Sequence, residues 1–154
     1  MPILPSCALG SLGKFMEPRL IFWPAVVMAT LTLAVALRMF RVRIAQIRRE
    51  HIRLQSIATS RASADKLTDS ASADNFRNLF ELPVLFYLAL CIAFLTAQVS
   101  MLVLALAWAF VATRLVHSAI HCSYNRVIHR FYAYITGYFV LCALWAVLTF
   151  GLLR

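Results

Sequence analysis

Acidic side chains are scarce in this sequence, which holds six Asp and Glu residues against fifteen Lys and Arg residues. Charged residues of both signs make up only 14% of the chain, while hydrophobic residues make up 62%. Soluble domains carry about 25% charged residues, so this chain has too little charge to cover the surface of a soluble fold. Its apolar residues lie in long blocks, and this arrangement predicts an integral membrane protein.

Cysteine is sparse as well. The four cysteines are Cys7, Cys91, Cys122 and Cys142, and no two of them form a CxxC pair. The spacing therefore predicts neither a disulfide framework nor a metal site. Cys91 and Cys142 fall within apolar blocks, where we expect them to act as small packing residues. The N-terminus lacks a basic segment followed by a short apolar core and a cleavage site, so no removable signal peptide is predicted.

Four apolar blocks are each long enough to cross a bilayer as a helix. We expect spans at about 20–40, 75–97, 99–122 and 130–153, within a single domain that covers residues 1–154. Short connections separate the last three spans, so these helices should run antiparallel. The predicted fold class is an all-α membrane protein, a four-transmembrane-helix bundle.

Basic residues are concentrated between the first two spans. Eight of the fifteen Lys and Arg residues lie between Arg38 and Lys66. Basic loops beside membrane spans usually face the cytoplasm and its anionic lipids. We therefore predict a multi-pass protein with both termini on the non-cytoplasmic face, in the inner or plasma membrane if the chain is bacterial. A basic run in this position argues against nucleic acid as a partner.

The second span opens with the polar stretch DNFRNLFELP, residues 74–83. Arg77 and Glu81 are four residues apart, so they would share one face of a continuous helix. Ionisable groups at a membrane boundary are costly unless they are paired or face a polar cavity, and they therefore indicate a site. The alternative is a capped helix start, with Asp74 or Asn75 as N-cap and Arg77 and Glu81 as a local ion pair.

Polar residues fall near the same end of all four expected spans. On the third span they follow the spacing i, i+3, i+7, i+10, which places them on one stripe of a helix. Pro83 is expected to kink the second span close to this layer. The residues of the layer are Arg38, Arg43, Arg77, Asn78, Glu81, Arg114, His117, His121, Tyr124, Arg126 and Arg130.

The chemistry of this layer suits a ligand that carries two carboxylates and one amine. Arginine binds carboxylates through two parallel hydrogen bonds, and Glu81 could accept from an ammonium group. A cation beside a thiol lowers its pKa and favours the nucleophilic thiolate. Arg126 and Arg130 open the fourth span and Tyr134 follows one turn later, so these three could hold a sulfur and a developing negative charge.

Two motifs resemble those of the MAPEG family, the membrane-associated proteins of eicosanoid and glutathione metabolism. The first is NFRNLFELP, residues 75–83, and the second is RxxHxxxH, residues 114–121, followed by YNRVIHR, residues 124–130. The resemblance covers the chain from about residue 20 to its end. It implies a four-helix membrane bundle that assembles as a homotrimer, with glutathione held between neighbouring subunits.

The resemblance also implies roles for single residues. Arg130 matches the arginine that stabilises the glutathione thiolate, and together with Tyr134 it forms the predicted catalytic pair. The resemblance implies glutathione contacts for Arg77, Asn78, Glu81, His117 and His121. The arginine-rich layer adds Arg38, Arg114 and Arg126 to the predicted glutathione-binding residues. Glutathione acts as a co-substrate in this prediction, and no metal is expected.

Three positions depart from the eicosanoid enzymes of the family. Phe131 follows the matched arginine where an animal prostaglandin synthase has serine, His121 stands where tyrosine is usual, and Asp74 stands where arginine is frequent. These differences argue against an eicosanoid substrate, and the chain is more similar to the bacterial branch.

Three functions remain open on the sequence. The first is a membrane-bound glutathione-dependent transferase or peroxidase that acts on lipophilic electrophiles. The second is a non-catalytic lipid-binding or scaffold protein of the same fold. In the third, His117 and His121, which are four residues apart, ligate haem or a metal. Nearby Arg114 and the lack of an acidic partner disfavour this third function.

Overall fold

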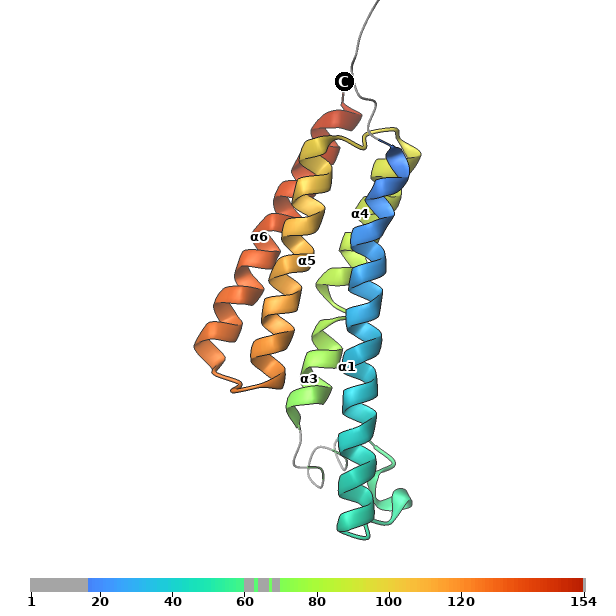
Figure 1. Ribbon diagram of the computed structural model, residues 1–154, viewed down its shortest axis with the longest axis vertical. Helices are drawn as coiled ribbons and strands as arrows, with labels where there is room; N and C mark the ends of the chain where they lie inside the picture. The colour runs from blue at the N-terminus through green and yellow to red at the C-terminus, as the bar shows by residue number, and fades with distance from the viewer. Residues whose placement is uncertain (1–16, 60–62, 64–66, 68–69, 154) are drawn as a thin grey trace, which may run out of the picture.

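The computed structural model of the protein describes residues 17–59, 63, 67 and 70–153 (Figure 1). The start of the chain and part of the basic loop lie outside the described residues. The elements are η1 (Pro18–Ile21), α1 (Phe22–Arg49), η2 (Leu54–Ile57), α3 (Ser70–Asn78), α4 (Leu82–Leu95), α5 (Met101–Cys122) and α6 (Val127–Leu152).

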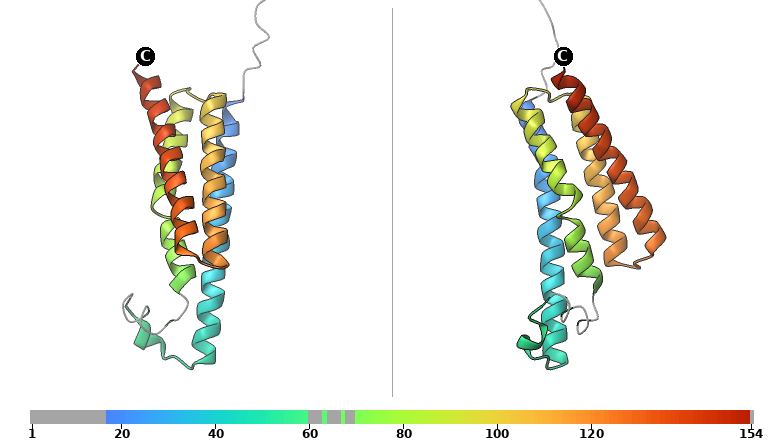
Figure 2. Two further views of the ribbon diagram at one scale, coloured as in Figure 1. Left: turned by 90° about the vertical axis from the view of Figure 1, so that its left-hand side faces the viewer. Right: turned by 180° about the vertical axis from the view of Figure 1, so that it is seen from behind.

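Four segments of the described chain are long and apolar enough to cross a membrane. They alternate in direction, so the start of α1 and the end of α6 lie at the same end of the bundle (Figures 1 and 2). α5 packs along α6, while α1 packs against α3 and α4. The expected all-α architecture with four long apolar helices is confirmed. The segments are Pro18–Arg49, Ala71–Leu95, Met101–Cys122 and Val127–Leu152.

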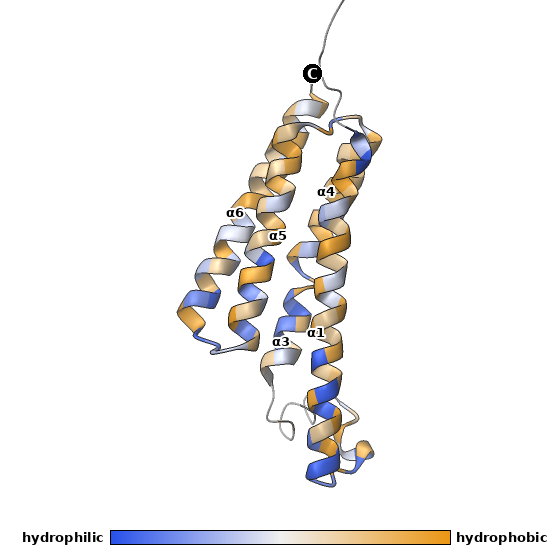
Figure 3. Ribbon diagram, viewed as in Figure 1, coloured by the Kyte–Doolittle hydropathy of each residue, from blue (hydrophilic) through white to orange (hydrophobic). Residues whose placement is uncertain are grey.

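The outer surface of the bundle is apolar along most of its length, and hydrophilic residues gather toward the lower end (Figure 3). Large side chains such as Leu33, Leu95 and Phe139 are 65%, 80% and 64% exposed. Surfaces of this kind need lipid or another apolar partner to cover them. Cys91 and Cys142, which were expected to act as small packing residues, are also exposed, so they are not buried within one subunit.

Close packing between helices holds the upper half of the bundle. Phe86 of α4 and Phe110 of α5 are fully buried and stack with their ring centroids 4.6 Å apart. Ala89, Ala93 and Ala107 are buried beside them. Helices in a membrane associate through such close contacts because the lipid supplies little hydrophobic driving force. Small residues next to stacked rings therefore let the backbones approach.

α1 continues well past the expected end of the first span, and it ends at Arg49. The guanidinium of Arg49 donates to the carboxylate of Glu50 at 2.9 Å, and the amide of Gln46 donates to it at 3.1 Å. These two hydrogen bonds hold the pKa of Glu50 below its usual value. They also offset the unfavourable position of a carboxylate at a helix C-terminus.

The second span is broken between α3 and α4. Pro83 has no N–H to bond the carbonyl of Leu79, and its ring would clash with that carbonyl in a continuous helix. α3 therefore ends before this point, and Glu81 becomes the N-cap residue of α4. The expected kink near Pro83 is present. However, Arg77 lies in the last turn of α3, so the prediction that Arg77 and Glu81 share a helix face is wrong.

Two expected helix starts also differ from the structure. α3 begins at Ser70, so Asp74 and Asn75 lie inside the helix and neither is its N-cap. Asn75 is instead fully buried. α6 begins at Val127, three residues before the expected start of the fourth span.

Tyr124 does not extend the polar stripe of α5, because the helix ends at Cys122. Asn125 adopts the left-handed conformation with φ 47°, and its N–H donates to the carbonyl of Ile120 at 2.9 Å. A left-handed residue with this hydrogen bond is a common way to close a helix C-terminus. The chain therefore turns away before Tyr124 can join the stripe.

We expect the end of the bundle that contains η2 and the α5–α6 turn to face the cytoplasm, because the adjoining segments are basic. Single cysteines at Ser56 and Ser123, in a chain whose own cysteines are replaced by alanine, should react with a membrane-permeant maleimide in intact cells but not with an impermeant one. A cysteine at Leu153 is the control and should react with both. Impermeant labelling at both test positions would reverse the orientation, and labelling at only one would contradict the antiparallel arrangement.

Candidate functional site

Hydrogen bonds, two of them to backbone carbonyls, and a ring contact between His117 and Tyr134 join polar residues of α4, α5 and α6 in the lower half of the bundle. We call these residues the polar cluster. They come from the break before α4, from one stripe of α5, and from the first two turns of α6. Its members are Glu81, Arg114, His117, His121, Arg130 and Tyr134.

Arg114 is the most deeply buried member of the cluster, with 0% of its surface exposed. One of its terminal nitrogens donates to the backbone carbonyl of Tyr134 at 3.2 Å. Its guanidinium carbon lies 5.4 Å from the ring centroid of Phe110 and 4.9 Å from that of Tyr134. Among the described residues no carboxylate forms an ion pair with it. Cation–π contacts and a backbone carbonyl therefore take the place of a counter-ion.

Gly137 makes room for this arginine on α6. A Cβ atom at Gly137 would lie 2.7 Å from a terminal nitrogen of Arg114 and 2.7 Å from the hydroxyl oxygen of Thr113. Both distances are too short for ordinary contact. Because Arg114 is enclosed between two rings, it has little freedom to move aside. The absence of a side chain at Gly137 therefore allows α5 and α6 to pack around a buried guanidinium.

His117 and His121 both contact Arg130 of α6. His117 Nδ1 lies 3.1 Å from the Arg130 carbonyl oxygen, and since a carbonyl only accepts, Nδ1 carries the proton. In the neutral ring Nε2 is then an acceptor, and this buried atom has no partner among the described residues. His121 Nε2 lies 3.1 Å from a terminal nitrogen of the Arg130 guanidinium. The two histidines thus hold both ends of one residue.

Tyr134 connects this group to α4. Its hydroxyl donates to the Glu81 carboxylate at 3.4 Å. Glu81 is exposed and sits at the helix break, which directs it toward α6. It is also the only acidic residue in the sequence after Asp74. Glu81 is therefore the only acidic side chain of the sequence that lies beyond α3.

The other predicted site residues lie outside this chain of contacts in the part of the molecule that the structure describes. The guanidinium of Arg38 on α1 donates to the Ser72 hydroxyl of α3 at 3.4 Å. Arg77 and Arg126 are exposed, and Asn78 is half-buried at the end of α3. The structure thus brings six predicted residues into contact and leaves four at the edge of the same region.

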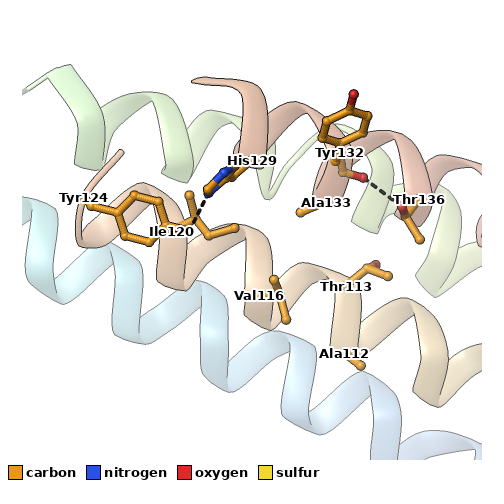
Figure 4. Close-up of a pocket in the computed structure, with 9 residues that line it drawn as sticks. All are labelled: Ala112, Thr113, Val116, Ile120, Tyr124, His129, Tyr132, Ala133 and Thr136. Carbon is orange, nitrogen blue, oxygen red and sulfur yellow. Dashed lines mark hydrogen bonds between the residues drawn. The ribbon is translucent and has the colours of Figure 1, made fainter. Parts of the chain in front are cut away.

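A groove of about 520 Å³ runs between α5 and α6, and none of its lining residues belongs to the polar cluster (Figure 4). At its lower end the hydroxyl of Tyr124 lies 3.1 Å from Nδ1 of His129. Most of its wall is apolar. The residues that line it are Ala112, Thr113, Val116, Ile120, Tyr124, His129, Tyr132, Ala133 and Thr136.

Comparison with family models decides between the possible four-helix membrane proteins. The model of the MAPEG family matches residues 21–150. The chain belongs to the MAPEG family. This is a family of glutathione-related membrane enzymes, and the protein is an integral multi-pass membrane protein. None of the curated proteins and none of the solved structures that were compared matches the chain. That one domain covers the whole of residues 1–154 stays a prediction.

Several residues around the cluster of this MAPEG protein were not expected from the sequence. The buried amide of Asn75 donates to the Cys122 sulfur at 3.4 Å and accepts from the Ser118 hydroxyl at 3.2 Å, which fastens α3 to α5. Ser118 and Cys122 each directly follow a histidine of the polar stripe in the sequence. This adjacency was the sequence signal that could have placed them near the cluster. Gly137 and Asn125 gave none, because their roles depend on how α5 meets α6.

Replacing Gly137 with alanine should destabilise the protein, although alanine is the better helix former by about 1 kcal/mol. Overpacking at a buried contact typically costs roughly 1–3 kcal/mol, so the melting temperature in detergent should fall. Gly151→Ala is the matched control. A Cβ atom there would meet the Gln98 side-chain amide, which can move aside, so this variant should be at least as stable as the natural chain. Equal melting temperatures for both variants would contradict the role of Gly137.

Proposed function

We propose that this MAPEG protein is a membrane-bound glutathione-dependent transferase or peroxidase that acts on lipophilic electrophiles. The observation that carries the proposal is a series of contacts across α4, α5 and α6. The Tyr134 hydroxyl donates to Glu81, the Tyr134 ring lies 5.9 Å from the His117 ring, His117 binds the backbone carbonyl of Arg130, and the Arg130 guanidinium lies against His121. An acid, a hydroxyl and a guanidinium are the groups that a thiol nucleophile with charged ends requires. Family membership supports the same chemistry.

Glutathione carries two carboxylates, one ammonium group and one thiol. In the proposal, exposed arginines at the edge of the cluster bind the carboxylates, because a guanidinium matches a carboxylate with two hydrogen bonds. Glu81 accepts from the ammonium group. It is the only acidic residue that follows Asp74 in the sequence. His117, another predicted glutathione-binding residue, has a buried acceptor at Nε2 without a partner among the described residues. The proposed carboxylate-binding residues are Arg38, Arg77 and Arg126, with Asn78 beside them.

The proposed reaction uses Arg130 to stabilise sulfur. A guanidinium has five N–H donors, and the contacts to His121 and Asn125 use only one terminal nitrogen of Arg130. The remaining donors can lower the thiol pKa and hold the thiolate. Tyr134 can donate its hydroxyl to the same sulfur once an ammonium group occupies Glu81. The thiolate then attacks the electrophilic carbon, a C–S bond forms, and the leaving group departs with its electron pair.

We also propose that the protein works as a homotrimer, with glutathione between neighbouring subunits. Four of the predicted binding residues lie at the edge of the cluster, and much of the apolar outer surface is exposed in one subunit. A neighbour that covers this surface would bring further groups to the edge. Native mass spectrometry of the detergent-purified protein tests the assembly. A trimer is expected, and a monomer that still binds glutathione would contradict it.

A non-catalytic lipid-binding protein is the alternative function. The observation that favours it is the apolar groove between α5 and α6, which has room for part of an acyl chain and is lined by no member of the cluster. In this case the polar cluster would serve mainly to fasten the helices. Glutathione turnover separates the two functions, because the alternative requires none.

Arg130→Ala should mainly lower the rate of conjugation, whereas Arg77→Ala should mainly weaken glutathione binding. Removing the cation beside sulfur should reduce kcat for conjugation of a generic electrophile and move the thiolate absorbance to higher pH, with glutathione still bound. Removing a carboxylate-binding arginine should weaken glutathione binding by roughly 1.5–3 kcal/mol, the range for a charged hydrogen bond, with kcat less affected. Ultraviolet absorbance against pH and a glutathione titration measure the two effects.

The matched control for both variants is Arg49→Ala, which removes an exposed arginine at the end of α1 and should change neither quantity. If the unmutated protein binds glutathione but shows no thiolate near neutral pH and conjugates nothing, the lipid-binding function is correct. Full activity in Arg130→Ala would show that Arg130 does not act on sulfur, and Tyr134 would be the next candidate.

A further inference from the structure

Both the backbone carbonyl and the guanidinium of Arg130, in the first turn of α6, have hydrogen-bond partners. His117 binds its backbone carbonyl at 3.1 Å, and His121 lies 3.1 Å from a terminal nitrogen of its guanidinium. The same nitrogen donates to the side-chain oxygen of Asn125 at 2.9 Å. A long arginine side chain at a helix start is normally free to adopt many rotamers. Two acceptors on one nitrogen remove most of that freedom.

The contact with Arg130 fixes the protonation state and the tautomer of the His121 imidazole. A guanidinium remains protonated in proteins and can only donate. Nε2 of His121 must therefore accept, so the ring is neutral and carries its proton on Nδ1. His121 is buried on α5, and its backbone is fixed by the helix. It is consequently a rigid acceptor for Arg130.

The turn between α5 and α6 fixes the second acceptor. Asn125 has φ 47°, a conformation that asparagine adopts more readily than most residues. Its N–H bonds the carbonyl of Ile120 at 2.9 Å and closes α5. The backbone geometry that ends one helix thus presents the Asn125 side chain to Arg130, which lies five residues further along the chain.

We infer that His121 and Asn125 are positioning residues, which hold the Arg130 guanidinium so that its remaining N–H groups meet the sulfur of glutathione. The inference rests on the proposed function. It differs from the direct glutathione contact that the resemblance implies for His121, since here His121 acts through Arg130. It also goes beyond a packing role, because fastening α5 to α6 would not require contact with the end of the guanidinium.

Matched substitutions separate positioning from packing. His121→Phe keeps an aromatic ring but removes the acceptor, whereas His121→Gln keeps a neutral oxygen that can accept. Asn125→Gly preserves the left-handed turn, since glycine adopts positive φ freely, and removes the amide. A small displacement of a reacting group can cost on the order of 100-fold in rate. We therefore expect His121→Phe and Asn125→Gly to lower kcat by roughly 10- to 100-fold.

The glutathione dissociation constant should stay within about threefold in these variants, because an arginine that acts on sulfur matters most in the transition state. His121→Gln should recover most of kcat and return the thiolate absorbance to the pH of the unmutated protein. An unchanged kcat in His121→Phe would overturn the inference. Equal losses in His121→Phe and His121→Gln would overturn it too, because a packing role would explain them.

A measurement without glutathione keeps the inference separate from the proposed function. The imidazole ¹⁵N resonances of the full chain in detergent, assigned by their loss in His121→Phe, should show Nε2 unprotonated and Nδ1 protonated. The Nε2 resonance should shift in Arg130→Met. A protonated Nε2, or one indifferent to Arg130→Met, overturns the inference whatever the activity. If the expected resonances are found while the unmutated protein neither forms a thiolate nor conjugates, the proposed function is what fails.

Discussion

A buried guanidinium without a carboxylate is the constraint on which the lower half of the bundle depends. Arg114 is fully buried in a membrane-spanning helix, where an unpaired charge is costly. The fold gives it one hydrogen bond to the Tyr134 carbonyl and the faces of two rings, while its Nε and second terminal nitrogen are buried without a partner among the described residues. This solution needs α6 at close range, which Gly137 allows. The register between α5 and α6 follows from where this one side chain can be accommodated.

The same register sets the rest of the cluster. Arg114, His117 and His121 lie on one stripe of α5, and each contacts a backbone or side-chain group of Arg130 or Tyr134. Packing and chemistry are therefore not competing explanations of the stripe, since the residues that fasten the helices also place the groups to which the proposed function assigns glutathione. A loss of activity on replacing Arg114 would for this reason say little about catalysis, and only paired measurements of stability, binding and rate can separate the two.

Hydropathy and helical spacing were enough to predict the four apolar helices and the polar stripe of α5, because both are patterns of side chains along one helix. The break before α4 was missed in part, because Arg77 and Glu81 were placed on a continuous helix although Pro83 was visible. The acceptors on α6 are backbone carbonyls, which no side-chain pattern reveals. Asn75 reads as a helix cap in the sequence, and only the packing of α3 on α5 shows that its amide is buried between them.

The helix break gives the acid and the cation of the proposed site different degrees of restraint. Glu81 is exposed and lies where α3 and α4 are interrupted, with one hydrogen bond of 3.4 Å from Tyr134. Arg130 is fixed by shorter contacts to two acceptors. A group that stabilises a developing charge acts best when it is already in place, whereas a group that captures a charged ligand end must exchange its partner on binding. In the proposed reaction the ammonium group replaces the Tyr134 hydroxyl at Glu81, and the hydroxyl released by that exchange becomes available to sulfur.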